Sequence, residues 1–136
     1  MAATLDDVAA IALALPGTTE EERSSGGRAW TVGTTTYAWE RAFSKADVRR
    51  FGDAAVPPPP IVAIRVDDLG DKEAVLAAGH RGVFTIPHFD GYAAVLVELR
   101  LVGRRVLRQL LEDGWAAGAP ASLLAARQPR RRPPRR

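Results

Sequence analysis

The stretch VLVELRLVGRRVLRQLLEDGW, residues 95–115, changes its hydrophobic period near Gly103. Up to Leu101, apolar side chains alternate along the chain, as expected for a strand with one buried face and one wetter face. From Arg104 onward, leucines and a tryptophan recur at helical spacing, and arginines occupy the opposite side. The segment therefore predicts a strand over 95–101 and a long amphipathic helix that ends near Gly118.

Two capping signatures mark further helices on the N-terminal side of this stretch. Thr4 and Asp7 precede an apolar pattern over 5–15, and Ser44 and Asp47 precede a short pattern that ends near Gly52. We expect the other elements to be strands over 29–32, 37–41, 61–66 and 83–86, helices over 71–78 and 121–127, a polar connection over 20–27 and an irregular proline run over 57–60.

The strands over 29–32 and 37–41 are expected to form a β-hairpin. A register that pairs Val32 with Tyr37 also pairs Trp30 with Trp39 on the same face, because side chains alternate along strands. The three aromatic rings have two interpretations. They pack in the core beneath helices, or they form a stacking platform for unpaired bases or an aromatic ligand.

Helices at both ends of a run of strands predict an α+β two-layer sandwich, with the terminal helices on one face of an antiparallel sheet. The length of 136 residues fits a single domain, which we place over 1–126. No apolar run is long enough to cross a membrane, and Asp6 and Asp7 stand where a secretory signal would carry basic residues. The absence of cysteine agrees with a reducing compartment, so we expect a cytoplasmic protein. We expect it to be a monomer.

The net charge of +3 hides an uneven distribution. Six arginines lie over 127–136, so the body keeps 13 basic residues against 16 carboxylates and carries −3. This Arg/Pro-rich tail has no apolar side chains, so it is predicted to be disordered. It either attracts polyanions such as nucleic acid or only keeps the chain in solution.

Five motifs occur in a fixed order along the body. They are Leu-Pro-Gly-Thr at 15–18, Trp-x-Val-Gly at 30–33, Tyr-Ala-Trp-Glu-Arg at 37–41, Pro-His-Phe-x-Gly-Tyr at 87–92 and Leu-Leu-x-x-x-Trp-x-x-x-Ala-Pro at 110–120. In this order and spacing, the chain resembles the MmcQ/YjbR family over about residues 4–126.

This resemblance implies a sandwich similar to the CyaY/frataxin fold, in a double-wing arrangement that is usually described as DNA-binding. A β-hairpin wing can lie along a DNA backbone or enter a groove, with Arg and Lys supplying phosphate contacts. One departure concerns the hairpin tip, where family members commonly carry a lysine after glycine. This chain has Gly33, Thr34 and Thr35 there, so the tip lacks a cation.

We expect any DNA binding to be weak and largely independent of sequence. Candidate contacts around the hairpin and the helix after it are Arg28, Arg41, Lys45, Arg49 and Arg50. Arg65 and Arg100 are expected on the wetter sheet face, and Arg130, Arg131 and Arg132 lie in the tail. Alternatively, each of these is an ordinary surface cation.

Nothing in the sequence predicts an enzyme, a cofactor or a metal site. Catalysis by His88 would need a partner such as Asp90, whereas a strand-end turn explains this histidine more simply. The carboxylates at 6–7 and 20–22 could ligate iron, but helix-dipole complementarity and a solvated loop explain them equally well. The alternative function is a small-ligand or protein-interaction module that uses the open sheet face and the aromatic hairpin, with Trp39 and His88 as ligand contacts.

Overall fold

The structure is a computed structural model that describes residues 2–24 and 26–127. Its helices are α1 (Leu5–Leu13), α2 (Lys45–Phe51), α3 (Leu69–Ala77), the short 3-10 helix η1 (Pro87–Phe89), α4 (Arg104–Gly118) and α5 (Ala121–Arg127). Its strands are β1 (Thr18–Glu22), β2 (Arg28–Val32), β3 (Thr35–Glu40), β4 (Ile61–Arg65), β5 (Val83–Phe84) and β6 (Ala94–Glu98).

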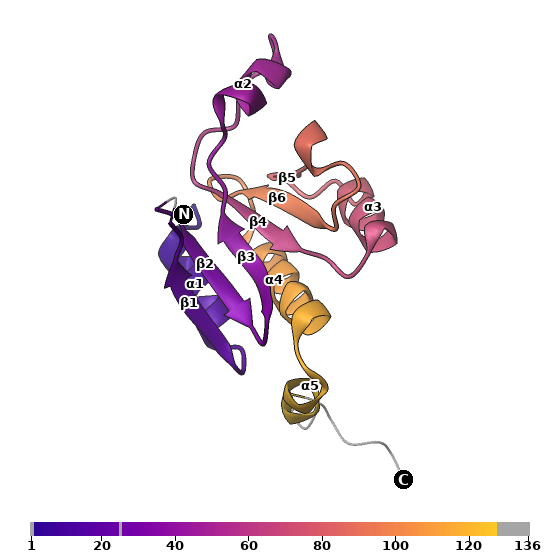
Figure 1. The fold of residues 1–136 in the computed structure, drawn as a ribbon. Coiled ribbons are helices and arrows are strands. Elements are labelled where there is room, and N and C mark those ends of the chain that lie inside the picture. Colours follow the sequence, from indigo (N-terminus) through magenta and orange to yellow (C-terminus); the bar gives the residue numbers. More distant parts are fainter. Residues whose placement is uncertain (1, 25, 128–136) are drawn as a thin grey trace.

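The strands form one antiparallel sheet in the order β1-β2-β3-β4-β6-β5. Helices α1 and α4 pack on each other and on one face of this sheet, as Figure 1 shows. The predicted α+β two-layer sandwich with terminal helices on one face is therefore confirmed. No helix in the described ranges is both long and apolar enough to cross a membrane.

Helix α4 follows the predicted period, but the wetter face expected for the preceding strand was wrong. Val95 and Val97 belong to the main core, whereas Leu96 is buried in a second cluster on the opposite sheet face. Both faces are covered because α1 and α4 pack over one of them and a cluster of aromatic side chains packs around Leu96 on the other. The strand also ends at Glu98, so Arg100 lies in the following turn and not on a sheet face.

The predicted hairpin exists, but its predicted register was wrong. Trp30 pairs with Ala38 and Thr31 pairs with Thr36, which leaves Tyr37 as an extra residue in β3. This irregularity puts Trp39 opposite Ala29, on the other sheet face from Trp30. A bulge inserts one residue and so reverses the alternation beyond it. The three aromatic rings therefore do not share a face.

A strand over 18–22 was not expected, because its three glutamates were predicted to belong to the polar connection over 20–27. β1 is an edge strand, and four of its five side chains are exposed. Charged side chains are common on edge strands because they discourage pairing with other chains. Helix α1 correspondingly ends at Leu13 and not at Leu15.

Both predicted capping boxes are present, at Thr4 with Asp7 and at Ser44 with Asp47. Helix α3 begins earlier than predicted, since Asp68 caps it by accepting a hydrogen bond from the backbone N–H of Asp71. The strand expected over 83–86 has only two residues, and the chain enters η1 at Pro87.

Two apolar clusters lie on opposite faces of the sheet. The larger lies under α1 and α4 and contains Trp30, Tyr37 and Trp115, which confirms the core interpretation for these three rings. The smaller surrounds Leu96 on the other face, where Trp39, Phe43, Phe51 and Phe84 pack against it. The second face is thus partly covered by aromatic side chains, among them Phe51 of α2 and Phe89 of η1.

Candidate nucleic-acid interface

The antiparallel register brings four arginines to one end of the sheet. Arg23 follows β1, Arg28 begins β2, Arg41 follows β3 and Arg100 lies just beyond β6. We call this the cationic end, and it includes α2, which follows β3. Arg65 lies at the opposite end, because it pairs with the first residue of β6.

Helix α2 adds a group of cations to this end of the sheet. Lys45, Arg49 and Arg50 are all exposed, and Figure 1 shows the helix standing clear of the sheet. Within the described residues, no carboxylate forms an ion pair with Lys45 or Arg49. These two charges are therefore available to an external anion.

Asp47 fixes α2 to the end of β3. Its buried carboxylate lies 3.0 Å from Arg41 and 3.8 Å from Arg50, and it also accepts a hydrogen bond from the backbone N–H of Ser44. Burial, the largest influence, raises the pKa of Asp47, but the Ser44 hydrogen bonds and the Arg41 charge together hold it below the ordinary value. The ionised carboxylate thus positions Arg41 beside the helix.

Arg28 lies apart from this group, toward α1. Its guanidinium is 3.1 Å from Glu20 and 3.0 Å from Asp6, and it lies over the Trp30 ring. The hydrogen bond to Glu20, and then the one to Asp6, raise the pKa of Arg28, while the same guanidinium lowers the pKa of Glu20. Two carboxylates therefore compensate the charge of Arg28.

The remaining predicted contacts are dispersed. Arg65 is half-buried at the far end of the sheet, whereas Arg100 is exposed near the cationic end. Arg130, Arg131 and Arg132 lie outside the described residues. The structure thus brings Arg41, Lys45, Arg49 and Arg50 together, and separates Arg65 from them.

A hollow of about 490 Å³ opens beside Trp39 at the cationic end. Its lining comprises Arg23, Gly26, Gly27, Trp39, Glu40, Arg41 and Ala42. The Arg23 guanidinium lies over the Trp39 ring at 5.8 Å, and Arg41 lies over Phe89 at 5.6 Å. Trp39 was predicted from the sequence as a ligand contact and Arg41 as a phosphate contact. Arg23 was not predicted, because strand β1, which positions it, was not expected.

The predicted ligand contact His88 lies beyond this hollow. It is exposed in η1, and its ring contacts Phe89 at 6.2 Å. Tyr92, which the sequence did not single out as a contact, is closer to Trp39, with 6.2 Å between the ring centroids. The sequence feature that could have marked Tyr92 as a candidate contact is its position in the Pro-His-Phe-x-Gly-Tyr motif.

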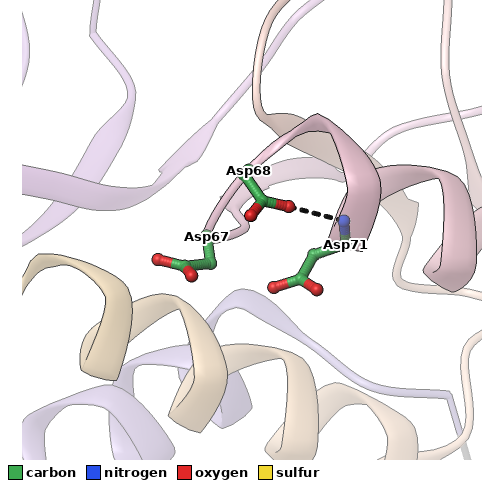
Figure 2. Close-up of side chains that lie close together, drawn as sticks. All are labelled: Asp67, Asp68 and Asp71. Carbon is green, nitrogen blue, oxygen red and sulfur yellow. Dashed lines mark hydrogen bonds between the residues drawn. The ribbon is translucent and has the colours of Figure 1, made fainter.

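Carboxylates gather at the other end of the sheet, after β4. Asp67 and Asp71 line a second hollow of about 410 Å³ between α3 and α4, together with Asp113. Figure 2 shows Asp67, Asp68 and Asp71 close together at the start of α3. Asp68, followed by burial and then by Asp67 and Asp113, raises the pKa of Asp71. Much of the acidic excess of the body thus lies away from α2.

The acidic residues considered as iron ligands near α1 are largely engaged in ion pairs. Asp6 and Glu20 bind Arg28, and Asp7 lies 3.1 Å from Arg104. The hydrogen bond from Arg104 is the largest influence that lowers the pKa of Asp7. These carboxylates hold β2 and α4 to α1.

The hairpin tip lies at the end of the sheet opposite to α2. A Cβ atom at Gly33 would come within 3.1 Å of the Pro120 ring, so the connection between α4 and α5 packs against the tip. The tip therefore offers no cation, and Pro120 packs against one side of it.

Comparison with known proteins found mycobacterial relatives. No protein-family model matches the chain, and no solved structure matches it. The uncharacterised proteins Mb2600 of Mycobacterium bovis and MT2646 and Rv2570 of Mycobacterium tuberculosis are each 42% identical over 126 residues, which cover 91% of this chain and 95% of the relative. At this identity and coverage, the chain belongs to the family of these mycobacterial proteins.

Proposed function

We propose that the chain is a non-enzymatic nucleic-acid-binding protein of the MmcQ/YjbR type that contacts phosphates through its cationic end. The observation that carries the proposal is the group of exposed cations on α2, where Lys45 and Arg49 form no ion pair with the described residues. The proposal places a monomeric protein in the bacterial cytoplasm, where nucleic acid is abundant.

The α2 helix provides the main phosphate contacts in this proposal. Arg41, Lys45, Arg49 and Arg50 face a single carboxylate over residues 41–50, and that carboxylate, Asp47, is buried. Lys and Arg that neutralise phosphates release condensed counterions, which gives affinity without sequence preference. The hairpin tip, which lacks a cation, would not act as a wing.

The arginines of the tail add to the same electrostatic attraction. Arg130, Arg131 and Arg132 raise the positive charge of the full chain, which favours weak association with any polyanion. The folded domain then supplies a fixed set of phosphate contacts. Substitutions within α2 separate this contribution from that of the tail.

Fluorescence anisotropy with labelled duplex DNA tests the proposal. We expect the full-length chain to bind, with an affinity that falls steeply between about 50 and 200 mM salt. A Lys45→Gln/Arg49→Gln variant should bind more weakly and lower the slope of log K against log salt by about 2, since each cation accounts for roughly one unit.

Arg105→Gln/Arg108→Gln is the matched control, because it removes the same charge from exposed positions on α4, which packs on the sheet face opposite to the one that Phe51 of α2 contacts. Equal losses in the two variants would show that net charge alone governs binding, and would refute the proposed interface. Absence of binding by the full-length chain at low salt would favour the small-ligand alternative, which the hollow beside Trp39 supports.

A further inference from the structure

Trp39 differs from the other two tryptophans in its hydrogen bonding. The indole N–H of Trp30 donates to Glu20 at 2.9 Å, and that of Trp115 donates to the Pro16 carbonyl at 2.8 Å. The indole N–H of Trp39 donates to no residue in the described part of the chain. Trp30 and Trp115 are 0% and 2% exposed, whereas Trp39 is only half-buried. Trp39 therefore has both ring surface and a donor available to a ligand.

The Trp39 ring rests on a firm aromatic support. Phe89 stacks with it at a centroid distance of 6.5 Å and an interplanar angle of 28°, and Tyr92 lies against it at a tilt. The buried Lys72 ammonium donates to the backbone carbonyls of Phe89 at 2.6 Å and Tyr92 at 2.9 Å. This anchor ties the loop that carries both rings to α3, so Trp39 has a preorganised backing.

Space for a planar ligand adjoins this ring. Gly26 and Gly27 form one wall of the hollow without side chains, and a Cβ atom at Gly26 would meet nothing within 4 Å. Its volume of about 490 Å³ is in the range of small-ligand sites. Arg23 lies over the Trp39 ring and is exposed, so its guanidinium can shift and form an ion pair with a phosphate.

Arg41 connects the hollow with α2. It lines the hollow, and its guanidinium also pairs with Asp47 at the foot of the helix. A chain of phosphates that passes Arg23 and Arg41 would continue to the exposed cations of α2. Stacking surface and phosphate contacts thus adjoin in one continuous region.

We propose that the hollow receives an unpaired nucleobase, which stacks on Trp39 while the flanking phosphates bind Arg23, Arg41 and α2. This inference rests on the proposed nucleic-acid function and names its preferred partner as single-stranded DNA or RNA. Bases in a duplex are stacked on one another and cannot enter such a hollow without being extruded. Aromatic stacking tolerates every base, because each base has a π-face.

Tryptophan fluorescence of the full-length protein tests this proposal directly, because Trp39 is the tryptophan whose ring is accessible. Short single strands of DNA and RNA should quench the emission, whereas a strand of the same length built of abasic nucleotides should not. The abasic strand keeps the phosphates and removes the stacking partner. Quenching that is equal for the two kinds of strand would overturn the proposal.

Anisotropy with the same strands compares Trp39→Leu, which keeps an apolar side chain, with Trp39→Phe, which keeps an aromatic face. We expect Trp39→Leu to weaken single-strand binding by roughly fivefold or more, with partial rescue by phenylalanine and little effect on duplex binding. Equal affinity of the wild-type chain for single strand, abasic strand and duplex would sink the stacking inference and leave the proposed function intact. Failure of all three strands to bind would refute both.

Discussion

Gly114 sets the distance between α4 and the sheet. A Cβ atom at this position would lie 2.8 Å from the carbonyl oxygen of Arg65 and 3.1 Å from Cγ2 of Ile64. Glycine inside a helix ordinarily costs about 1 kcal/mol relative to alanine, so its presence here reflects close packing. The contact holds the amphipathic helix of residues 104–118 against β4.

We therefore predict that Gly114→Ala lowers the free energy of unfolding by about 1–3 kcal/mol, as overpacking does in cores. Urea denaturation provides the measurement. Gly70→Ala in α3 is the matched control, because its added Cβ would approach only Oδ1 of the exposed Asp68 side chain, at 3.3 Å, and no backbone atom. The control should be neutral or stabilising, and a neutral Gly114→Ala would show that α4 does not pack this closely.

At the scale of elements, the helix starts could be predicted because capping hydrogen bonds join residues close in sequence. The strand register could not, because it depends on contacts between distant segments. The side chains of Thr4 and Ser44 bond backbone groups three residues away, so sequence alone reveals them. Tyr37, the extra residue in β3, packs under α1. There its hydroxyl forms a hydrogen bond with the Thr18 hydroxyl and donates to the Ala12 carbonyl. The alternation of apolar and polar residues along the chain does not predict such a contact between distant segments.

The attachment of α2 should depend on pH through Asp47. The Ser44 and Arg41 contacts outweigh burial and lower the pKa of Asp47 in the folded state, so the unfolded chain binds a proton at higher pH than the folded chain does. The stabilisation is therefore present above the ordinary value of 3.8 and is lost as pH falls through the lower folded pKa. The protection factors of the α2 amides against hydrogen exchange should therefore fall in that range.

Asp47→Asn provides the comparison for this pH dependence. The amide cannot ionise, so α2 in the variant should exchange faster than wild type near neutral pH and should lose the Asp47 contribution to acid sensitivity. An α2 whose exchange is unaffected by the substitution would show that Phe43 and Phe51, which pack against the second apolar cluster, hold the helix without the ion pairs.

At the scale of the whole molecule, the folded domain carries one group of exposed cations and, elsewhere, one group of carboxylates. Exposed cations gather at α2 and at nearby strand ends, and the carboxylates of Asp67, Asp68, Asp71 and Asp113 gather beside α3 and α4. The net charge of −3 for the body conceals this separation. The candidate arginines could be listed from the sequence. Their positions could not, because the strand order decides that Arg65 lies at the opposite end of the sheet and that Arg23 lies over the Trp39 ring.

Chemical-shift mapping of the isotope-labelled full-length chain with a short single-stranded oligonucleotide tests the proposed interface most directly. We expect the amide resonances of residues 23–27 and 39–51, and the indole N–H resonance of Trp39, to change their chemical shifts on titration. The resonances of residues beside Asp67 and Asp113 should not change. Shifts confined to residues 128–136, or centred on the α3–α4 hollow, would contradict it.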